Sequence, residues 1–272
     1  MRNGWRRGFK NYFKNIYAYV TILRMERYSN YDSFAWLYDR EWSEYAKAIF
    51  PLLKDIAGEK LPDGAKVLDL CCGTGQLAKV LTEKGYKVTG IDGSAEMLRY
   101  AKSNAPDAEF INEDARAFKL PSRYNAVFST FDSLNHILKA AELLRTFKNT
   151  YKCLVSGGIF IFDLNTERNF KTNWKNLKII KETPDYFYAV HSDYDPEKRL
   201  APWQCTIFRR KGRGWQRSDI LLQEAFYPDA EVKSLLKRAG FTAIKTYSAS
   251  RERGLHKPNR GSSKIFYFAL KP

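Results

Sequence analysis

The sequence predicts an α/β protein built around a mostly parallel sheet with helices on both faces. Between residues 65 and 115, apolar segments of strand length alternate with segments whose apolar residues recur every three or four positions: AKVLDLC, GQLAKVLTEKG, YKVTGID, SAEMLRYAKSNA and AEFINED. Such alternation is typical of β-α-β units and therefore of parallel strands. In addition, the first apolar segment runs directly into a glycine turn and then a helix.

The flanking segments extend this core at both ends. A helical pattern runs from about Asp32 to Ile56 and stops before the chain break at Pro62-Asp63-Gly64. Beyond residue 115, further strands are expected at NAVFST and GGIFIFDLN, separated by a helix over AAELLRTFKNTYKCL. The sheet therefore continues to about residue 165.

Residues 166–227 change character, because polar and apolar residues alternate in YFYAVHSDYD and WQCTIFRR, before a turn at Lys211-Gly212-Arg213-Gly214. We interpret this segment as an antiparallel insertion. A helix then runs from Asp229 to a stop at Gly240, and FTAIKTYSAS and SKIFYFALK form a final hairpin. We accordingly divide the chain into four parts: a basic amphipathic helix at 1–28, a core with a helical lid at 29–165, the insertion at 166–227, and the C-terminal part of the core at 228–272.

Composition and charge narrow the class of protein further. Hydrophobic residues make up 44% and aromatic residues 15% of the 272 residues, which is enough for a packed core. Lys and Arg number 46 against 30 Asp and Glu, a net charge of +16. This charge favours contact with RNA, an acidic lipid surface or an anionic substrate, with a plain role in solubility as the alternative. No apolar run approaches the roughly 20 residues that cross a bilayer.

The cysteines and histidines predict no metal site. The four cysteines form no CxxC pair and show no ligand-like spacing with the three histidines; they are Cys71, Cys72, Cys153 and Cys205. We interpret them as reduced thiols, which fits a cytoplasmic protein.

The first 28 residues carry a pattern of their own. Apolar residues recur every three or four positions between basic residues, at Trp5, Phe9, Tyr12, Phe13, Ile16, Tyr17 and Val20. This pattern predicts an amphipathic helix. The helix either docks on the domain, which we favour, or offers a basic surface to an acidic membrane or to RNA.

The segment VLDLCCGTG, residues 67–75, carries the main chemical signal. Gly73 and Gly75 let the backbone approach a ligand closely, and the helix that follows offers unpaired N–H groups. A nucleotide-like cofactor is therefore expected there. Because Gly73-x-Gly75-x-x-Ala78 also fits a dinucleotide-binding turn, a nicotinamide cofactor is the alternative.

Three carboxylates accompany the first three strands. Asp69 lies inside the first strand, a costly position unless it holds the amides of the glycine turn or a cationic ligand group. Asp92 ends the second strand, where its two oxygens can accept both ribose hydroxyls of a nucleoside. Asp114 ends the third strand, close to the expected position of an adenine amino group.

The motifs VLDLCCGTG, VTGIDGS, INEDA, FSTFDSLNHI and GGIFIFDLN, in this order, resemble the class I methyltransferases that depend on S-adenosylmethionine (SAM). The resemblance covers the chain from about Asp32 to its C-terminus. It implies a Rossmann-like, seven-stranded sheet of order 3-2-1-4-5-7-6, SAM as cofactor, S-adenosylhomocysteine as product, and no metal.

The resemblance also implies the residues that surround the cofactor. Asp69, Gly73 and Gly75 would surround the methionine part, Asp92 the ribose, and Asp114 with Ala115 the adenine. The remaining candidates in these motifs are Cys71, Gly93, Met97 and Phe131. Cys71 replaces a glycine that many members have, which narrows the turn slightly.

Aromatic residues of the lid segment are candidates for contact with the cofactor's sulfonium, since an aromatic face stabilises a cation by about 0.5–2 kcal/mol. Core packing explains most such residues, including Trp36 and Trp42, so we select Tyr31 and Tyr38. On the acceptor side, His136 is the candidate general base because it follows the fourth strand and titrates near neutrality. Asp132 is a comparable candidate, whereas His191 in the insertion could face either the acceptor or solvent.

The function expected from these residues is methyl transfer to an N or O atom of a small molecule. The Asn-Pro-Pro-Tyr signature of RNA-modifying relatives is absent, and the insertion can close a pocket. An RNA methyltransferase is the alternative that the +16 charge suggests. A membrane-associated enzyme with a lipid-like acceptor and a non-catalytic SAM-binding protein are weaker alternatives. A cluster at the insertion tip allows an anionic acceptor or simple solvation, and comprises Arg209, Arg210, Lys211, Arg213 and Arg217.

Overall fold

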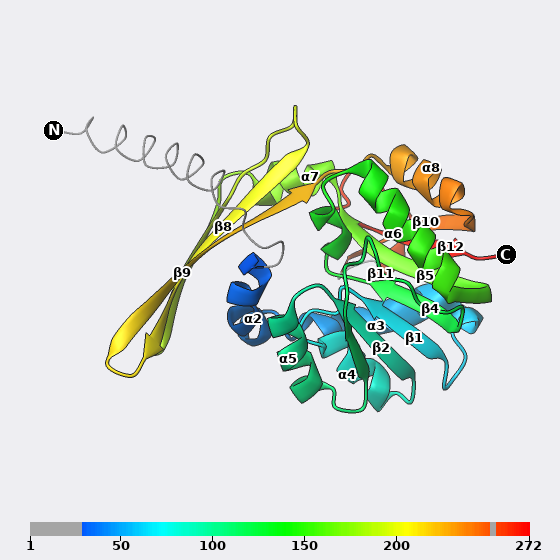
Figure 1. Cartoon of the computed structure of the whole chain (residues 1–272). Coiled ribbons are helices and arrows are strands. Elements are labelled where there is room, and N and C mark those ends of the chain that lie inside the picture. The colour runs from blue at the N-terminus through cyan, green and yellow to red at the C-terminus, as the bar shows by residue number, and fades with distance from the viewer. Residues whose placement is uncertain (1–28, 251–253) are drawn as a thin grey trace.

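The computed structural model describes residues 29–250 and 254–272 (Figure 1). The amphipathic helix expected at residues 1–28 lies outside the described residues. Within those residues, no helix is both long and apolar enough to cross a membrane.

A large mixed sheet forms the core, and its strands are ordered β3-β2-β1-β4-β5-β12-β10-β11. The parallel part comprises β1 (Lys66–Leu70), β2 (Lys87–Asp92), β3 (Glu109–Asn112), β4 (Tyr124–Ser129) and β5 (Leu154–Asn165). The antiparallel part comprises β12 (Lys264–Leu270), β10 (Thr242–Ser250) and β11 (Gly254–His256). The predicted fold class and strand order are confirmed, and β11 adds a short edge strand that the sequence did not predict.

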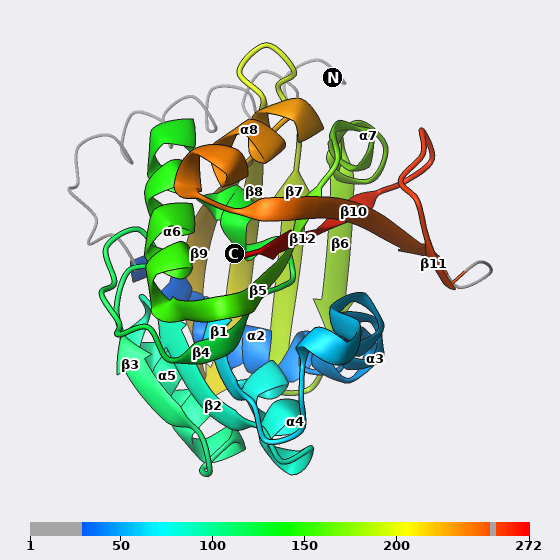
Figure 2. The same ribbon diagram turned by 90° about the vertical axis from the view of Figure 1, so that its right-hand side faces the viewer.

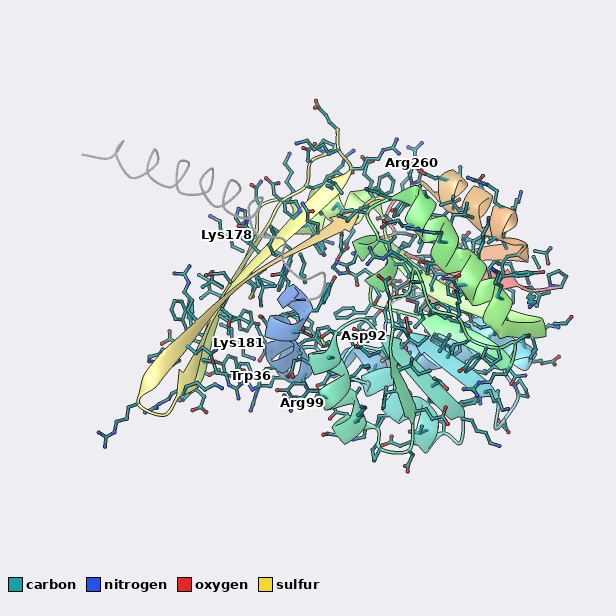
Figure 3. The ribbon with its side chains drawn as sticks, viewed as in Figure 1. Trp36, Asp92, Arg99, Lys178, Lys181 and Arg260 are labelled. Atoms are coloured by element: carbon teal, nitrogen blue, oxygen red, sulfur yellow. The ribbon has the colours of Figure 1, made fainter. Side chains whose placement is uncertain are left out.

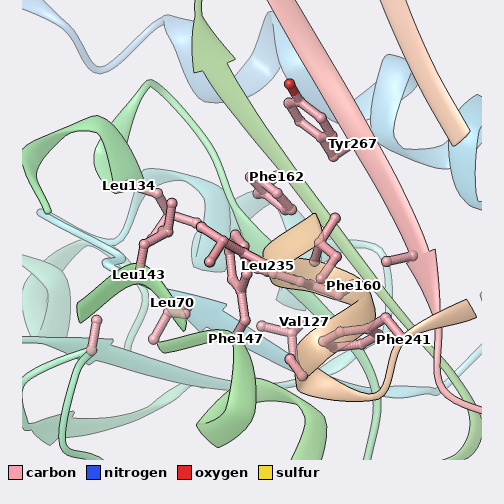
Figure 4. Packing of buried hydrophobic residues seen from close by; sticks show 14 of the residues in the cluster. Leu70, Val127, Leu134, Leu143, Phe147, Phe160, Phe162, Leu235, Phe241 and Tyr267 are labelled. Atoms are coloured by element: carbon pink, nitrogen blue, oxygen red, sulfur yellow. The ribbon is translucent and has the colours of Figure 1, made fainter. Parts of the chain in front are cut away.

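Helices cover both faces of this sheet, as Figure 2 shows. One face carries α6 (Ala140–Cys153) and α8 (Asp229–Ala239), while the other carries α3 (Tyr45–Ala57) and α4 (Gln76–Glu83). Strand β5 shows why both faces need cover: Phe160 and Phe162 pack toward α6, whereas Ile159 and Ile161 pack toward α3 and α4. This alternation follows from the two-residue period of a strand. Figure 4 shows the face with Phe147, Phe160 and Phe162 in contact.

The lid segment divides into two helices, α2 (Ser29–Glu41) and α3, where the sequence predicted one continuous helical region. Helix α2 packs against α5 (Ala95–Asn104) and the insertion, whereas α3 packs against α4 and β5. The chain changes direction at residues 42–44 because the two helices bury their apolar sides against different partners. A short turn η1 (Gly58–Lys60) then leads into β1.

The insertion forms a second sheet of order β6-β7-β8-β9 in which all pairs are antiparallel. It follows the short helical segments α7 (Glu167–Asn169) and η3 (Phe170–Trp174), and its strands are β6 (Leu177–Glu182), β7 (Tyr186–Ser192), β8 (Leu200–Lys211) and β9 (Gly214–Ala225). Strands β8 and β9 form a long ribbon that extends away from the core (Figure 1). The inner face of this sheet buries Ile220 and Leu222 in one cluster with Phe34 and Leu37 of α2. The predicted antiparallel insertion is thus present, and α2 lies between it and α5.

Candidate functional site

A cavity of about 550 Å³ lies between the carboxyl ends of the parallel strands, α2 and the inner face of the insertion sheet. Its volume is in the range of small-molecule sites. Figure 3 places Asp92 on the side of the central sheet that faces α2 and the insertion. Most of the residues predicted from sequence meet here: Tyr31, Tyr38, Cys71, Gly73, Asp92, Gly93, Met97, Asp114, Ala115, Phe131, Asp132 and His136.

Three other candidates lie elsewhere. Asp69 lines a small hollow beside the cavity, next to Tyr38 and Phe131. Gly75 is the N-cap residue of α4 and packs against α5. His191 is exposed on β7 and is not among the residues that line the cavity. Of the two tryptophans that were not selected, Trp42 lines the cavity, whereas the Trp36 ring contacts the guanidinium groups of Arg40 and Arg209.

The glycine turn has the backbone that close approach to a ligand requires. Gly73 and Gly75 have φ angles of 53° and 78°, and Cys71 also has a positive φ of 62°. A Cβ on Gly73 would lie 3.3 Å from the Tyr38 ring, so a side chain there would press on the cavity wall. Because Cys71 is not a glycine, its left-handed backbone costs of order 1–3 kcal/mol. Such strained conformations recur at functional sites.

We expect Gly75→Ala to lower the free energy of unfolding by about 3 kcal/mol, because the new Cβ would clash as well as strain the backbone. That Cβ would lie 2.9 Å from both Cα and Cβ of Ala101. Gly85→Ala is the matched control, since Gly85 has a similar φ of 84° and no atom within 4 Å of the added carbon. It should cost only about 1 kcal/mol. Urea unfolding of both variants measures the difference, and equal losses would show that the contact with Ala101 relaxes freely.

Asp92 connects the glycine turn to the start of α5. One carboxylate oxygen accepts the N–H of Gly73 at 2.9 Å, and the other accepts the N–H of Ser94 at 2.9 Å. Burial raises the pKa of Asp92, and these N–H groups oppose that effect. Since each carboxylate oxygen accepts more than one hydrogen bond, both oxygens keep capacity for a pair of ligand hydroxyls.

Two polar atoms near the glycine turn lack partners among the described residues. Oδ2 of Asp69 and Oγ1 of Thr74 are buried and make no hydrogen bond. Burial, followed by the charge of Asp92, raises the pKa of Asp69 to about 7. A buried unsatisfied carboxylate is costly unless a ligand supplies a donor or a positive charge. The residues present therefore fit a cationic cofactor such as the one that the sequence predicts.

The raised pKa of Asp69 predicts a pH effect on stability. The folded-state pKa of about 7 lies above the ordinary value of 3.8, so folded protein binds this proton more tightly. The stabilisation is complete below the ordinary pKa and is lost as pH rises through about 7, by up to about 4 kcal/mol. Asp69→Asn should therefore flatten the decline in stability between pH 5 and pH 8. Urea unfolding at both pH values tests this, with exposed Asp63→Asn as control; parallel declines in all three proteins would contradict it.

The loop after β4 is held by Asp163, a residue that sequence reasoning did not select. Phe131 and Asp132 have φ angles of 62° and 53°, in the left-handed region. The Asp163 carboxylate accepts both of their N–H groups, at 2.8 and 2.7 Å. Nζ of Lys264 lies 2.8 Å from Asp163 and 3.0 Å from Asp132. Burial alone would raise the pKa of Asp132 and lower the pKa of Lys264. The charge interactions outweigh burial, so Lys264 lowers the pKa of Asp132, and both carboxylates raise the pKa of Lys264.

His136 is oriented by the backbone of β9. Its Nδ1 lies 2.9 Å from the carbonyl oxygen of Gln223, and since a carbonyl only accepts, Nδ1 carries the hydrogen. This leaves the lone pair on Nε2, which lies 3.5 Å from Oε1 of Glu224. Burial lowers the pKa of His136, against the opposing charge of Asp132. His136 is therefore neutral at neutral pH, as a general base must be.

Glu224 is the second residue that the sequence reasoning missed. It is buried on the inner face of β9, and its Oε2 accepts a hydrogen bond of 2.8 Å from the side-chain amide of Asn165. The same amide donates to Asp132 at 2.7 Å. Burial, followed by the charge of Asp132, raises the pKa of Glu224 well above its usual range. Its position after Ile220 and Leu222 in the alternating pattern was a signal, because it places an acid where an inward apolar residue is expected.

Aromatic rings line the part of the cavity nearest the glycine turn. Tyr45 stacks on Phe131 with ring centroids 4.3 Å apart, and Tyr38 lies beside Phe131 at 6.1 Å. Tyr31 meets the His136 ring edge-on at 5.6 Å. Nζ of Lys264 lies 5.6 Å from the centroids of both the Tyr45 and the Phe131 ring, so these two rings already contact a cation.

Contrary to the sequence-based prediction, Asp114 does not end the third strand. Strand β3 ends at Asn112, so Asp114 lies in the following turn. Its oxygens accept hydrogen bonds of 2.8 and 2.7 Å from the Arg116 side chain. Contact of Asp114 with adenine stays a prediction, since this carboxylate already has a strong partner.

The sequence of this chain is similar to those of known methyltransferases. A family model described as "Methyltransferase domain" matches residues 67–158, from β1 into β5. The chain is 26% identical to YqeM of Bacillus subtilis, named as a methyltransferase, over 89% of this chain and 97% of that protein. A stretch of 82 residues is 39% identical to dTDP-3-amino-3,6-dideoxy-alpha-D-glucopyranose N,N-dimethyltransferase of Streptomyces fradiae, covering 30% of this chain and 32% of that enzyme.

The fold is also similar to solved structures. The crystal structure of an S-adenosylmethionine-dependent methyltransferase from Clostridium acetobutylicum superposes with a TM-score of 0.74 at 22% identity. The match covers 89% of this chain and 98% of that one.

Proposed function

Because this chain is a class I SAM-dependent methyltransferase, we propose that it methylates a nitrogen or oxygen atom of a small molecule bound between the glycine turn and the insertion sheet. The proposal rests on one observation: the same cavity is lined by the glycine turn and by the insertion sheet. Gly73 and Asp92 lie at one end, and Glu224 and Trp203 of the insertion lie at the other. A cofactor and an acceptor can therefore meet in one cavity.

The residues around the glycine turn fit the cofactor. Bound SAM supplies a methyl group on a positively charged sulfur. Asp92 is placed to accept the ribose hydroxyls, and Asp69 is the carboxylate toward which a positive ligand group would be drawn. Tyr38 and Phe131 present rings on the same side of the cavity.

The acceptor side contains the groups that remove a proton. A nitrogen or oxygen nucleophile attacks through a lone pair, so a proton must leave before or during attack. His136 Nε2 has an available lone pair, because Gln223 holds the hydrogen on Nδ1. Asp132 is a poorer base than the sequence suggested, since its carboxylate is engaged by Lys264 and Asn165. We therefore propose His136 as proton acceptor and Asp132 as a positioning residue.

Two further observations support a small acceptor. The relative from Streptomyces fradiae is named for N,N-dimethylation of an amino sugar, a small-molecule acceptor. On the insertion side the cavity is lined by the apolar side chains of Trp174, Ile179 and Trp203, which suit a small molecule better than a phosphate backbone. RNA methylation, which the +16 charge favours, is the competing function. The four cysteines are free thiols, which supports a cytoplasmic location.

A labelling experiment tests the proposal. The purified protein is incubated with methyl-labelled SAM and a cell extract, and the label is separated into RNA, lipid and small-molecule fractions. After unreacted SAM has been removed, we expect label among the small molecules, and none with an Asp92→Ala protein. Label that precipitates with RNA would overturn the small-molecule acceptor, and SAM binding without any transfer would favour a non-catalytic SAM-binding protein.

A further inference from the structure

The charge of the cavity wall is opposite to that of the whole chain. The acidic side chains that line it are Asp92, Glu113, Asp114, Asp132 and Glu224, whereas the basic ones are Arg116 and Lys264. Arg116 pairs with Asp114 and Glu142, and Lys264 pairs with Asp132 and Asp163. In the described part of the chain, both basic side chains of the wall are thus held by carboxylates. An anionic acceptor would find no cation prepared for it, despite the net charge of +16.

The basic cluster at the insertion tip does not supply that cation. Arg217 pairs with Asp219 on the same strand, and Arg209 stacks on Trp36. None of the five basic tip residues is among those that line the cavity. The tip therefore belongs to the outer surface rather than to the acceptor site.

The acceptor end of the cavity combines apolar walls with one buried acid. Leu177 and Ile179 of β6, Trp203 of β8 and Leu222 of β9 contribute the apolar walls. Among them lies Glu224, whose side chain is only 3% exposed. Its hydrogen bonds engage Asn165, and Nε2 of His136 lies 3.5 Å away. A buried carboxyl group next to a proton-accepting nitrogen suits a ligand group that is cationic in water and must lose a proton.

We propose that the acceptor is a primary or secondary amine on an apolar body. For this acceptor Glu224, rather than His136, binds the amine nitrogen and takes its proton, and His136 relays to water the proton that Glu224 releases. This inference rests on the proposed function and specifies its acceptor. It replaces the anionic acceptor that the net charge suggested with a cationic one.

The proton and electron balance of the step follows from this geometry. Burial raises the pKa of Glu224 in the free protein, which favours the protonated carboxyl group. An ammonium group that docks beside it displaces this proton through Nε2 of His136 to water, because the new positive charge stabilises the carboxylate. The Glu224 carboxylate then takes a proton from the ammonium, which frees the nitrogen lone pair. That lone pair forms the N–C bond to the methyl carbon while the C–S bond breaks, and the electron pair of the broken bond stays on sulfur as a neutral thioether.

The first test uses the acid–base behaviour of the labelled product. Small-molecule label from the extract experiment is partitioned between water and an organic solvent at pH 3 and at pH 11. An amine on an apolar body enters the organic phase at pH 11 and stays in water at pH 3. Label that is extracted equally at both pH values, only at pH 3, or at neither would overturn the amine assignment while the methyltransferase proposal stands. Absence of transferred label would instead contradict the methyltransferase proposal.

The second test compares Glu224→Gln with Glu182→Gln, an exposed glutamate on β6 of the same sheet. With the small-molecule fraction as acceptor, Glu224→Gln should lower the rate at pH 7 at least 100-fold, a typical effect of losing a general base. Its affinity for SAM should change less than about twofold, because Glu224 lies at the acceptor end. Glu182→Gln should match the parent protein.

The pH profile separates proton transfer from a merely structural role of Glu224. As pH rises from 7 to 10, free amine accumulates in solution and needs no base, so the deficit of Glu224→Gln should shrink. A deficit that stays constant across this range, or a parallel loss of SAM affinity, would overturn the role proposed for Glu224.

Discussion

Asp92→Ala is expected to weaken SAM binding by at least about 100-fold while the protein stays folded. The carboxylate accepts the N–H of Gly73 and the N–H of Ser94, so its removal releases the glycine turn as well as the predicted ribose contact. Hydrogen bonds to a charged group contribute roughly 1.5–3 kcal/mol each, and 1.4 kcal/mol is a factor of ten in affinity. Isothermal titration of SAM into parent and variant measures the change.

Two further variants make this result interpretable. Asp92→Asn keeps one acceptor oxygen but presents an N–H to one of the two amides, so we expect an intermediate loss of affinity. Asp107→Ala removes an exposed aspartate from the loop before β3 and should bind SAM like the parent protein. Affinity within a factor of three of the parent for Asp92→Ala, with an unchanged melting temperature, would show that Asp92 does not hold the cofactor.

The parallel core was predictable because its signals are local. The apolar segments, the helical periodicity and the turn at Gly73 and Gly75 all lie within about 50 consecutive residues, and each specifies its own element. Strand order then followed from the family resemblance rather than from periodicity. The edge strand β11 escaped prediction because three residues, Gly254–His256, are too few for a periodic pattern.

The acceptor end was less predictable because its residues come from strands far apart in the sequence. Asp163, Glu224 and Lys264 lie on β5, β9 and β12, and only the pairing of β5 with β12 and the docking of β9 bring them together. A single lysine or glutamate within a strand does not form a sequence motif that indicates a function. By contrast, His136 and Asp132 lie within seven residues of the end of β4, so their place in the local sequence indicated them. The residues that set their protonation lie far away in the sequence and were not predicted.

The same distinction explains the charge of the site. Net charge is a sum over the whole chain, and it predicted contact with anions. The cavity instead collects carboxylates at the ends of several strands, where each basic residue of the wall is already paired. The overall charge therefore says little about the acceptor.

Asp163→Ala is expected to lower the free energy of unfolding by about 3–5 kcal/mol and to abolish methyl transfer. The carboxylate is fully buried and accepts the N–H groups of Phe131 and Asp132 while it pairs with Lys264. Leaving buried donors without an acceptor costs about 1–3 kcal/mol each, and the unpaired side of Lys264 adds to this cost. Urea unfolding measures the first effect, and label transfer from SAM measures the second.

The loss of transfer follows from strain as well as from stability. Phe131 and Asp132 keep their left-handed backbone only while Asp163 holds both amides, so the loop should relax to ordinary φ angles in the variant. Phe131 would then leave its stack on Tyr45, and Asp132 would leave Asn165. Asp163→Asn retains one acceptor oxygen and should lose about half as much stability, whereas exposed Asp185→Ala should lose almost none. A loss below about 1 kcal/mol in Asp163→Ala would mean that water replaces the carboxylate, and the loop would then owe its shape to the packing of Phe131 on Tyr45.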